Sequence, residues 1–369
     1  MADRQQADYH DRVRRAQAEM ARQGVDALAI GVGADLIYLA GYPSHTSERL
    51  TLMIVPKEGE PKIVVPQLEA PRLGPAGVPF APVAWEETAD PSSIAADIIW
   101  ETGARSVASG DELWASFLIK MQRHLPEVKW EIAGGIMREL RMCKDAAEVA
   151  LIREASHRTD EAWVEFTKTK IAGLTERQAG DRLMGLMRDH GMESIDFCIC
   201  ASGPNSASPH YSTADRVIGE GDAVVFDFGG RYRHYVSDIT RTVHIGAPSD
   251  EYRKVYAVVL RANEAAYAAV RPGVSCQEID RAARKVITDA GYGEYFIHRV
   301  GHGLGLDVHE EPYMVEGNTL PLRVGMVFSD EPGVYLPGKF GVRIEDSVVC
   351  TETGGEKLND APRDLLVME

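Results

Sequence analysis

Two aspartates in the second half of the chain are spaced as if they lay on one β-hairpin. Asp227 ends an apolar run that leads into two glycines, and Asp238 lies on the returning strand expected over residues 235–243. A turn centred between Tyr232 and Arg233 would place the two aspartates opposite each other. Opposed side chains on neighbouring strands have Cβ atoms about 5 Å apart. The spacing therefore predicts two carboxylates in close proximity.

Two glutamates further along the chain repeat this pattern. Glu331 follows an apolar run and Glu345 lies on the returning run, with the pair symmetric about Gly338. Any one acid on a hairpin is ordinarily solvated, but four carboxylates in apolar surroundings repel one another unless a proton or a cation lies between them. Two divalent ions, roughly 3.5–4 Å apart, would account for all four.

A glycine-rich segment, residues 299–309, adds a histidine to this set. His302 lies between two glycines, which allow the backbone to approach a crowded site closely. One imidazole with four carboxylates suits Mn²⁺, Co²⁺, Fe²⁺ or Zn²⁺, and the oxygen-rich set favours Mn²⁺. A nucleotide-binding loop is a weaker interpretation of these glycines, because no strand–turn–helix unit surrounds them.

A repeat with an offset of 100 residues indicates how these hairpins are positioned. Asp145 with Glu148 predicts a capped helix, and the same pattern follows at Thr175 with Gln178 and at Ser275 with Glu278. Each half is expected to contain two helices followed by strands, and an internal duplication explains this economically. Two unrelated helical pairs remain the alternative. A pseudo-twofold axis would bring the acidic hairpins together, whereas His302 has no counterpart in the repeat.

The first part of the chain has a different pattern of apolar and polar residues. Short apolar runs alternate with amphipathic segments, and residues 57–61 read as a hairpin turn. This predicts an α/β domain over residues 1–140, followed by an α+β domain over residues 141–369.

Composition narrows the function classes. The 369 residues carry 40 basic and 56 acidic side chains, a formal net charge of −16, which argues against nucleic acid or a membrane as the main partner. The N-terminus lacks an apolar stretch typical of a signal peptide, and no run is long enough to span a bilayer. The five scattered cysteines favour a reducing cytoplasm over a disulfide framework.

These features resemble the pita-bread metallopeptidase family, which includes methionine aminopeptidase, aminopeptidase P and prolidase. The matching motifs cover residues 140–369, and the N-terminal part resembles the creatinase-type domain that accompanies the Xaa-Pro peptidases. The resemblance implies an α/β N-terminal domain joined to a pita-bread catalytic domain with a pseudo-twofold internal duplication. It rests on the segments 210–211, 225–229, 237–242, 301–310, 331–335 and 341–346.

The resemblance also assigns roles to individual residues. His210 and His309 match histidines that contact the substrate and stabilise the tetrahedral intermediate, His298 matches a further active-site histidine, and Arg343 resembles an arginine that orients the bridging acids. Glu331 is expected to carry the proton of the water that attacks the carbonyl before proline. The five metal ligands implied by the family are Asp227, Asp238, His302, Glu331 and Glu345.

The far end of the substrate is less defined by these motifs. Some prolidases place an arginine four positions after the His309 equivalent to bind the proline carboxylate, and this chain has Tyr313 there. Arg49 is a candidate replacement from the N-terminal domain, with a surface ion pair to Glu48 or another acid as the alternative. The resemblance predicts a cytoplasmic, homodimeric Xaa-Pro dipeptidase acting on proline-containing dipeptides or short peptides. Aminopeptidase P, acting on longer peptides, is the alternative, and a non-catalytic binding module is remote.

Overall fold

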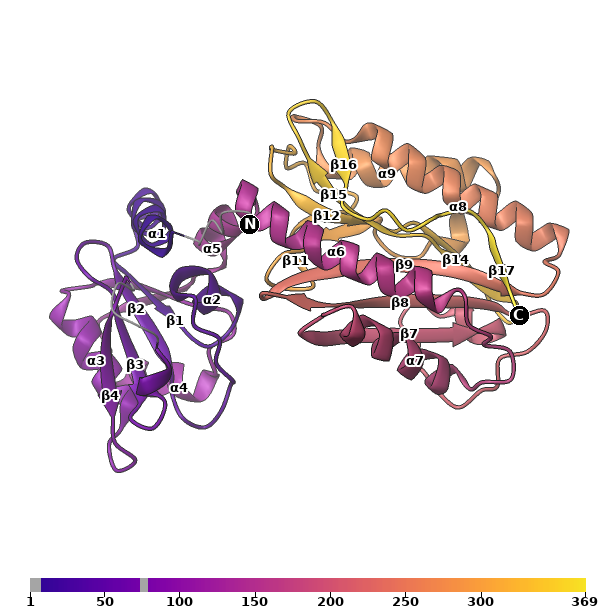
Figure 1. Cartoon of the computed structure of the whole chain (residues 1–369). Helices are drawn as coiled ribbons and strands as arrows, with labels where there is room; N and C mark the ends of the chain where they lie inside the picture. The colour runs from indigo at the N-terminus through magenta and orange to yellow at the C-terminus, as the bar shows by residue number, and fades with distance from the viewer. Residues whose placement is uncertain (1–7, 74–78) are drawn as a thin grey trace, which may run out of the picture. The chain divides into compact units, whose positions relative to one another are not determined.

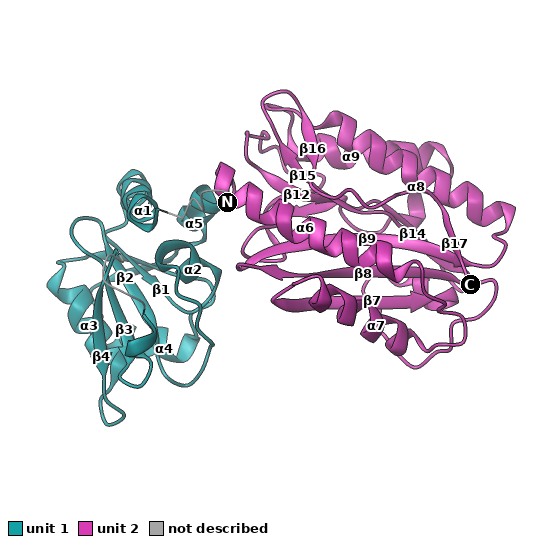
Figure 2. Ribbon diagram, in the orientation of Figure 1, with its two compact units in different colours: residues 1–141 teal, residues 142–369 magenta. Residues whose placement is uncertain are grey.

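The computed structural model describes residues 8–73 and 79–369, which divide into two compact units, residues 1–141 and 142–369 (Figures 1 and 2). Each unit has its own hydrophobic core. Among the helices of the described residues, none combines the length and the apolar composition needed to cross a bilayer.

The first unit is an α/β domain, as predicted. Its six-stranded mixed sheet has the order β4-β3-β2-β1-β5-β6, with β2 antiparallel to both of its neighbours. The turn predicted at residues 57–61 joins β2 to β3. The elements are α1 (Tyr9–Gln23), β1 (Ala27–Ile30), α2 (Ala34–Ala40), β2 (Leu52–Pro56), β3 (Lys62–Pro66), β4 (Ala81–Trp85), α3 (Pro91–Glu101), β5 (Ser106–Ser109), α4 (Ala115–His124), β6 (Lys129–Ile132) and α5 (Gly134–Arg141).

The first half of the second unit packs two helices on an antiparallel sheet (Figure 1). Trp163 and Phe166 of the long helix α6 contact Phe226 with ring centroids 5.5 and 5.0 Å apart, so aromatic burial fixes this helix on the sheet. The elements are α6 (Ala146–Phe166), α7 (Glu176–Asp189), β7 (Ser194–Ser202), β8 (Ala223–Tyr232) and β9 (Tyr235–Ile245), and β17 (Leu366–Met368) adds a parallel edge strand.

The second half repeats this arrangement. Helices α8 and α9 share a core with β12, β14 and β15, and the sheet order is β11-β10-β12-β15-β16. The elements are α8 (Asp250–Ala269), α9 (Cys276–Asp289), β10 (Gly301–Gly303), β11 (Glu310–Met314), β12 (Val327–Asp330), β13 (Gly333–Leu336), β14 (Phe340–Arg343), β15 (Asp346–Cys350) and β16 (Gly355–Lys357).

The predicted 100-residue offset is present in the backbone. Helix α9 begins and ends 100 residues after α7. Gly173 and Gly273 have φ of +89° and +87°, and Gly191 and Gly291 have +85° and +86°. These left-handed conformations favour glycine, so the repeat conserves the backbone turns that orient the helix pairs.

The helix caps follow the repeat only in part. The capping boxes predicted at Asp145 and at Thr175 are both present. The one predicted at Ser275 is wrong: Ser275 occupies the N-cap position of α9, but its side chain makes no capping hydrogen bond. The Glu278 backbone N–H instead donates to the Ser275 carbonyl, which closes the first turn without the hydroxyl.

The turn predicted for the first acidic hairpin is also displaced. Tyr232 pairs with Tyr235, so the turn residues are Arg233 and His234, with φ of +48° and +73°. Asp227 consequently lies opposite Thr240, and Asp238 lies opposite Gly229. The two aspartates are diagonal neighbours rather than an opposed pair. Both still project from the same face of the sheet, because the register moves by two residues and side chains alternate with period two.

The second acidic hairpin has the predicted register. Val327 pairs with Val349 and Gly333 with Arg343, so the ladder is symmetric about Gly338 on both sides of the glutamates. Strand β10, which carries His302, pairs antiparallel with β12 as β7 pairs with β8. The strand of His302 therefore belongs to the duplication, although the residue type is not repeated.

Candidate metal centre and cavity

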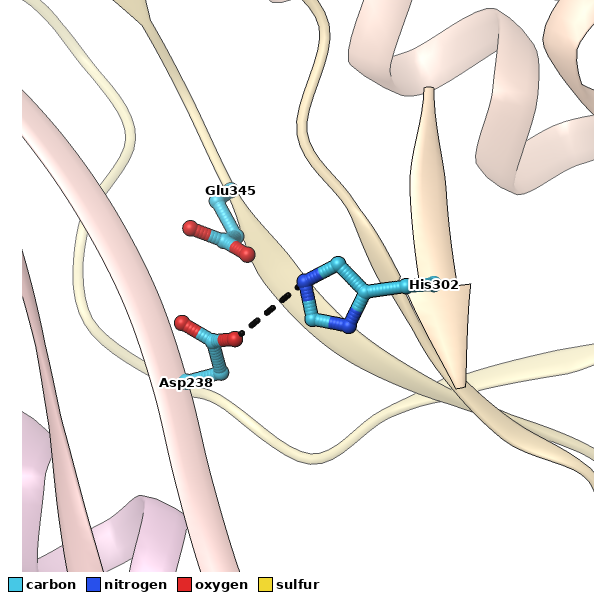
Figure 3. Close-up of side chains that lie close together, drawn as sticks. All are labelled: Asp238, His302 and Glu345. Carbon is cyan, nitrogen blue, oxygen red and sulfur yellow. Dashed lines mark ion pairs between the residues drawn. The ribbon is translucent and has the colours of Figure 1, made fainter. Parts of the chain in front are cut away.

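Three of the predicted ligands converge in the second unit. Asp238 on β9, His302 on β10 and Glu345, which follows β14, each offer a ligand atom within 4.8 Å of the others, and all three are buried. Figure 3 shows the two carboxylates and the imidazole edge turned toward one another. His302 Nε2 is 3.6 Å from an Asp238 oxygen and 3.3 Å from a Glu331 oxygen.

The backbone fixes the tautomer of His302. Its Nδ1 lies 3.1 Å from the Gly303 carbonyl oxygen, which can only accept, so Nδ1 carries the proton. The lone pair of Nε2 then faces carboxylate oxygens. Burial, and secondly His309, lower the pKa of His302 to about 3, so the ring is neutral at neutral pH. A neutral imidazole facing carboxylates is the arrangement that a divalent cation satisfies.

The carboxylates themselves are destabilised as anions by their surroundings. Burial, followed by the charges of Asp227 and Glu331, raises the pKa of Asp238 well above its usual range. Burial, followed by Asp238 and Glu331, does the same for Glu345, and burial raises the pKa of Glu331 to about 7. Bound cations relieve this repulsion and allow all the acids to ionise, so the donor set fits divalent metal ions.

Asp227 is held beside this cluster by a buried arginine. Arg343 Nη2 donates to Asp227 Oδ2 over 2.5 Å, and its Nε donates to Thr240 Oγ1 over 3.0 Å. Thr240 Oγ1 in turn donates to Glu345 over 2.6 Å. The guanidinium therefore fixes one acid from each hairpin, directly in one case and through a hydroxyl in the other.

A cavity of about 670 Å³ opens onto these groups, within the range of small-ligand sites. Its wall contains all five predicted ligands, the three predicted histidines and Arg343. Tyr313 is not among the lining residues, and every lining residue belongs to the second unit. The remaining lining residues are Phe197, Ile199, Pro209, Arg299, Val308 and Val315.

The three histidines of the cavity differ in their surroundings. His210 and His309 are exposed, and the His309 ring lies edge-on to His302 with centroids 3.9 Å apart. Burial, and secondly Arg299, lower the pKa of His309. His298 is more enclosed: its Nδ1 donates to the Arg299 carbonyl and its Nε2 lies 2.9 Å from the Tyr335 hydroxyl. Its two nitrogens are thus committed to protein groups.

Arg49 makes contacts within the first unit. Its guanidinium is 2.6 Å from Glu48 and 2.7 Å from Glu87. This is the ion pair that the sequence offered as the alternative to substrate binding.

Four further residues shape the site without having been assigned a role from the sequence. Ser329 Oγ donates to Glu331 and accepts from the His302 backbone N–H. Tyr335 Oη accepts from Arg343 over 2.8 Å. Thr240 and Tyr335 lie inside the motifs, but a motif does not reveal which members form hydrogen bonds. Arg299 precedes a recognised motif by two residues, and no spacing signal marks it.

A second hollow, of about 550 Å³, contains His157, His190 and several acids. Its groups are already paired with one another, since His190 Nε2 is 2.9 Å from Glu165 and His157 is 3.3 Å from Asp360. Exposed pairs of this kind are ordinary surface features. The cavity at His302 is therefore the candidate active site.

Comparison with known proteins agrees with this geometry. Residues 150–352 match metallopeptidase family M24, and residues 12–143 match the creatinase/prolidase N-terminal domain. The probable dipeptidase PepE of Mycobacterium tuberculosis is 38% identical over 366 residues, covering 98% of this chain and 96% of that protein.

Solved structures show the same fold. A prolidase from Thermococcus sibiricus superposes with a TM-score of 0.94 at 37% identity, covering 98% of this chain and 100% of that one. Dipeptidase PepE from Mycobacterium ulcerans superposes with a TM-score of 0.91 at 40% identity, covering 97% of each chain. The predicted fold class is confirmed, and divalent metal ions are implied by the family. The chain belongs to metallopeptidase family M24 and carries a creatinase/prolidase N-terminal domain ahead of its pita-bread catalytic domain.

Proposed function

We propose that this chain is a Xaa-Pro dipeptidase that uses two divalent ions, with Mn²⁺ as the native metal. The observation that carries the proposal is the neutral His302 nitrogen, which faces the carboxylates of Asp238 and Glu331 in a cavity of about 670 Å³. The names of the relatives, dipeptidase and prolidase, support the substrate class. The oxygen-rich donor set supports Mn²⁺ over Zn²⁺, with Co²⁺ and Fe²⁺ as further options.

Five residues would hold the ions: Asp227, Asp238, His302, Glu331 and Glu345. When bound there, divalent ions activate water and polarise the scissile carbonyl. Asp238 and Glu345 are the two buried acids at the centre of the cluster, and both would contribute ligand oxygens. Arg343 and Thr240 keep the carboxylates oriented, so that binding requires little rearrangement.

The chain's own groups would then move the proton and stabilise charge. Glu331 accepts a proton from the attacking water and returns it to the proline nitrogen as the C–N bond breaks. His309 and His210, exposed at the cavity wall, donate hydrogen bonds to the carbonyl oxygen as negative charge develops on it. His298 has both nitrogens engaged, so its proposed part is to hold Tyr335 and shape the wall.

Aminopeptidase P activity is the second candidate. This activity requires the cavity of about 670 Å³ to accept a peptide longer than two residues. Arg49 remains a proposed contact to the substrate carboxylate, although it must leave Glu48 and Glu87 to make one. If Arg49→Ala leaves dipeptide and tripeptide cleavage unchanged, that contact is refuted.

One experiment tests the main proposal. The protein is stripped of metal, restored with Mn²⁺, Co²⁺ or Zn²⁺ in turn, and assayed with Ala-Pro and with Ala-Pro-Ala. Mn²⁺-dependent cleavage of Ala-Pro, with much slower cleavage of the tripeptide, is expected. Comparable tripeptide cleavage would replace the dipeptidase by an aminopeptidase, and inactivity with every metal would refute the enzyme proposal.

We also propose a cytoplasmic homodimer. No disulfide joins the five cysteines, all of which lie in the part of the chain that the structure describes, and this supports a reducing compartment. Light scattering during size-exclusion chromatography measures the oligomeric state directly, and a monomer would refute the dimer.

A further inference from the structure

The cavity contains a cation that the proposed chemistry does not use. Arg299 lines the wall beside His298, and its guanidinium lies over the Tyr313 ring at 4.2 Å from the centroid. Among residues 8–73 and 79–369, no carboxylate forms an ion pair with it. The other arginine of the wall, Arg343, is committed to Asp227. Arg299 is thus the arginine of the wall that remains available to a ligand.

Tyr313 explains how this cation is held. It lies on β11 opposite His302, so its ring is anchored by the strand that borders the metal centre. A guanidinium stacked on an aromatic face keeps its N–H edge free, because the ring contacts its plane and not its donors. Tyr313 is therefore, in this chain, a platform for an arginine from the neighbouring segment.

We propose that Arg299, positioned by the Tyr313 ring, binds a carboxylate of the substrate and thereby sets substrate selectivity. The inference rests on the proposed peptidase function and deepens it. A planar guanidinium with free edges matches a carboxylate, and Arg299 presents such a guanidinium at the cavity wall, stacked on Tyr313. A Xaa-Pro dipeptide offers such a group at its C-terminus, and an acidic first residue offers another on its side chain.

The test compares substrates that differ in one carboxylate. Ala-Pro is compared with Ala-Pro-amide, and Glu-Pro with Gln-Pro, for wild type and Arg299→Gln at saturating Mn²⁺. Loss of one charge-assisted contact is expected to lower kcat/KM about 10- to 100-fold, mainly through KM, for the substrate whose carboxylate is bound. The neutral counterpart should change less than about threefold. A selective loss with Ala-Pro assigns the C-terminal carboxylate, and a selective loss with Glu-Pro assigns the side chain.

Variants of Tyr313 test the positioning role. Tyr313→Phe keeps the ring and should retain wild-type selectivity, whereas Tyr313→Leu should lose about two- to fivefold in kcat/KM for the same substrate. Arg271→Gln, an exposed arginine in the same unit that does not line the cavity, is the matched control and should change nothing.

The possible failures are distinguishable. Wild-type enzyme that cleaves none of these substrates with any metal refutes the proposed function itself. The carboxylate-binding role alone is refuted if the wild type is active but Arg299→Gln does not discriminate within either pair. In that case kcat/KM falls equally for the acidic and the neutral substrate of both pairs, or falls for none of them. Chelator titration of Mn²⁺ in both proteins provides a readout besides activity: equal metal affinity is expected, and a large decrease would make Arg299 a support of the metal centre instead.

Discussion

Arg343→Lys isolates the contribution of hydrogen-bond geometry to the metal centre, because it keeps the positive charge and removes the planar fork. Arg343 donates to Thr240 over 3.0 Å, to Tyr335 over 2.8 Å and to Asp227 over 2.5 Å, each from a different nitrogen. A lysine ammonium is a single point and cannot occupy all three positions. We expect it to keep Asp227 and to lose the hydrogen bonds to Thr240 and Tyr335.

The magnitude follows from those two hydrogen bonds. Each contributes about 1 kcal/mol, so the loss is about 2 kcal/mol, or roughly 30-fold in the dissociation constant for Mn²⁺. This lies within the range of about 10- to 100-fold that is typical of residues supporting metal ligands. Competition with a fluorescent chelator measures the constant, and saturating Mn²⁺ should restore most of kcat.

The control for this prediction is Arg271→Lys, an exposed substitution that leaves the cavity intact. Urea unfolding of the metal-free proteins separates metal affinity from general instability. If Arg343→Lys binds Mn²⁺ within threefold of wild type, the fork does not organise the ligands and the reasoning from Arg343 fails.

Three further predictions follow from the site and the caps. Metal binding should release protons, because burial and neighbouring carboxylates raise the pKa values of Asp238 and Glu345 in the metal-free protein. Calorimetric binding enthalpies should therefore depend on the ionisation enthalpy of the buffer, and identical enthalpies in different buffers would contradict this. Burial, with a smaller effect of Arg343, lowers the pKa of His298 from 6.5 to about 3. Between these two pH values the unfolded state binds a proton at this histidine and the folded state does not. The free energy of unfolding should therefore fall as the pH drops from 6.5 toward 3. Urea midpoints of metal-free protein should show a shallower fall for His298→Gln, and an unchanged slope would argue against this histidine. Thr175→Ala should lower the free energy of unfolding by about 1 kcal/mol, since the Thr175 hydroxyl caps α7. Ser275→Ala should leave it nearly unchanged, because the Ser275 side chain makes no capping hydrogen bond. Equal losses in urea unfolding would contradict this difference.

The helices and the duplication could be predicted because their signals are local. The capping box at Asp145 and the left-handed glycines at the helix ends are visible in the sequence and are present in the structure. The turn at Arg233 and His234 could not be predicted in the same way. Two successive residues with positive φ ordinarily signal themselves by Asn-Gly or Asp-Gly, and Arg-His has no such signature. The predicted register therefore differs by two residues from the observed one, although both aspartates lie on the predicted face.

The specificity residues were harder to identify than the metal ligands, for a physical reason. The ligands lie on regular hairpins, where register alone brings distant residues together. Arg299 lies in a segment outside the strands, and its contact with Tyr313 depends on where the side chain folds back. The spacing from His309 shows that Tyr313 stands where an arginine is expected. The contact of its ring with Arg299 depends on the fold and cannot be predicted from that spacing.

The duplication also shows why the predicted metal centre has its imidazole ligand, His302, in the second half of the unit and none in the first. Asp227 pairs with Ile199, and the Glu331 N–H donates to the Val300 carbonyl, so Glu331 stands where Asp227 stands in the first half. By the same register, His302 and Ser329 correspond to Ala201 and Val225, which are 1% and 3% exposed and apolar. The first hairpin therefore contributes oxygen ligands against a packed apolar strand. The second places an imidazole and a hydroxyl there, and the hydroxyl binds both the His302 backbone and Glu331. The two halves thus differ at these two positions and also in hairpin register, because Asp227 and Asp238 are diagonal neighbours whereas the ladder around Glu331 and Glu345 is symmetric about Gly338. These differences give the centre distinct sides.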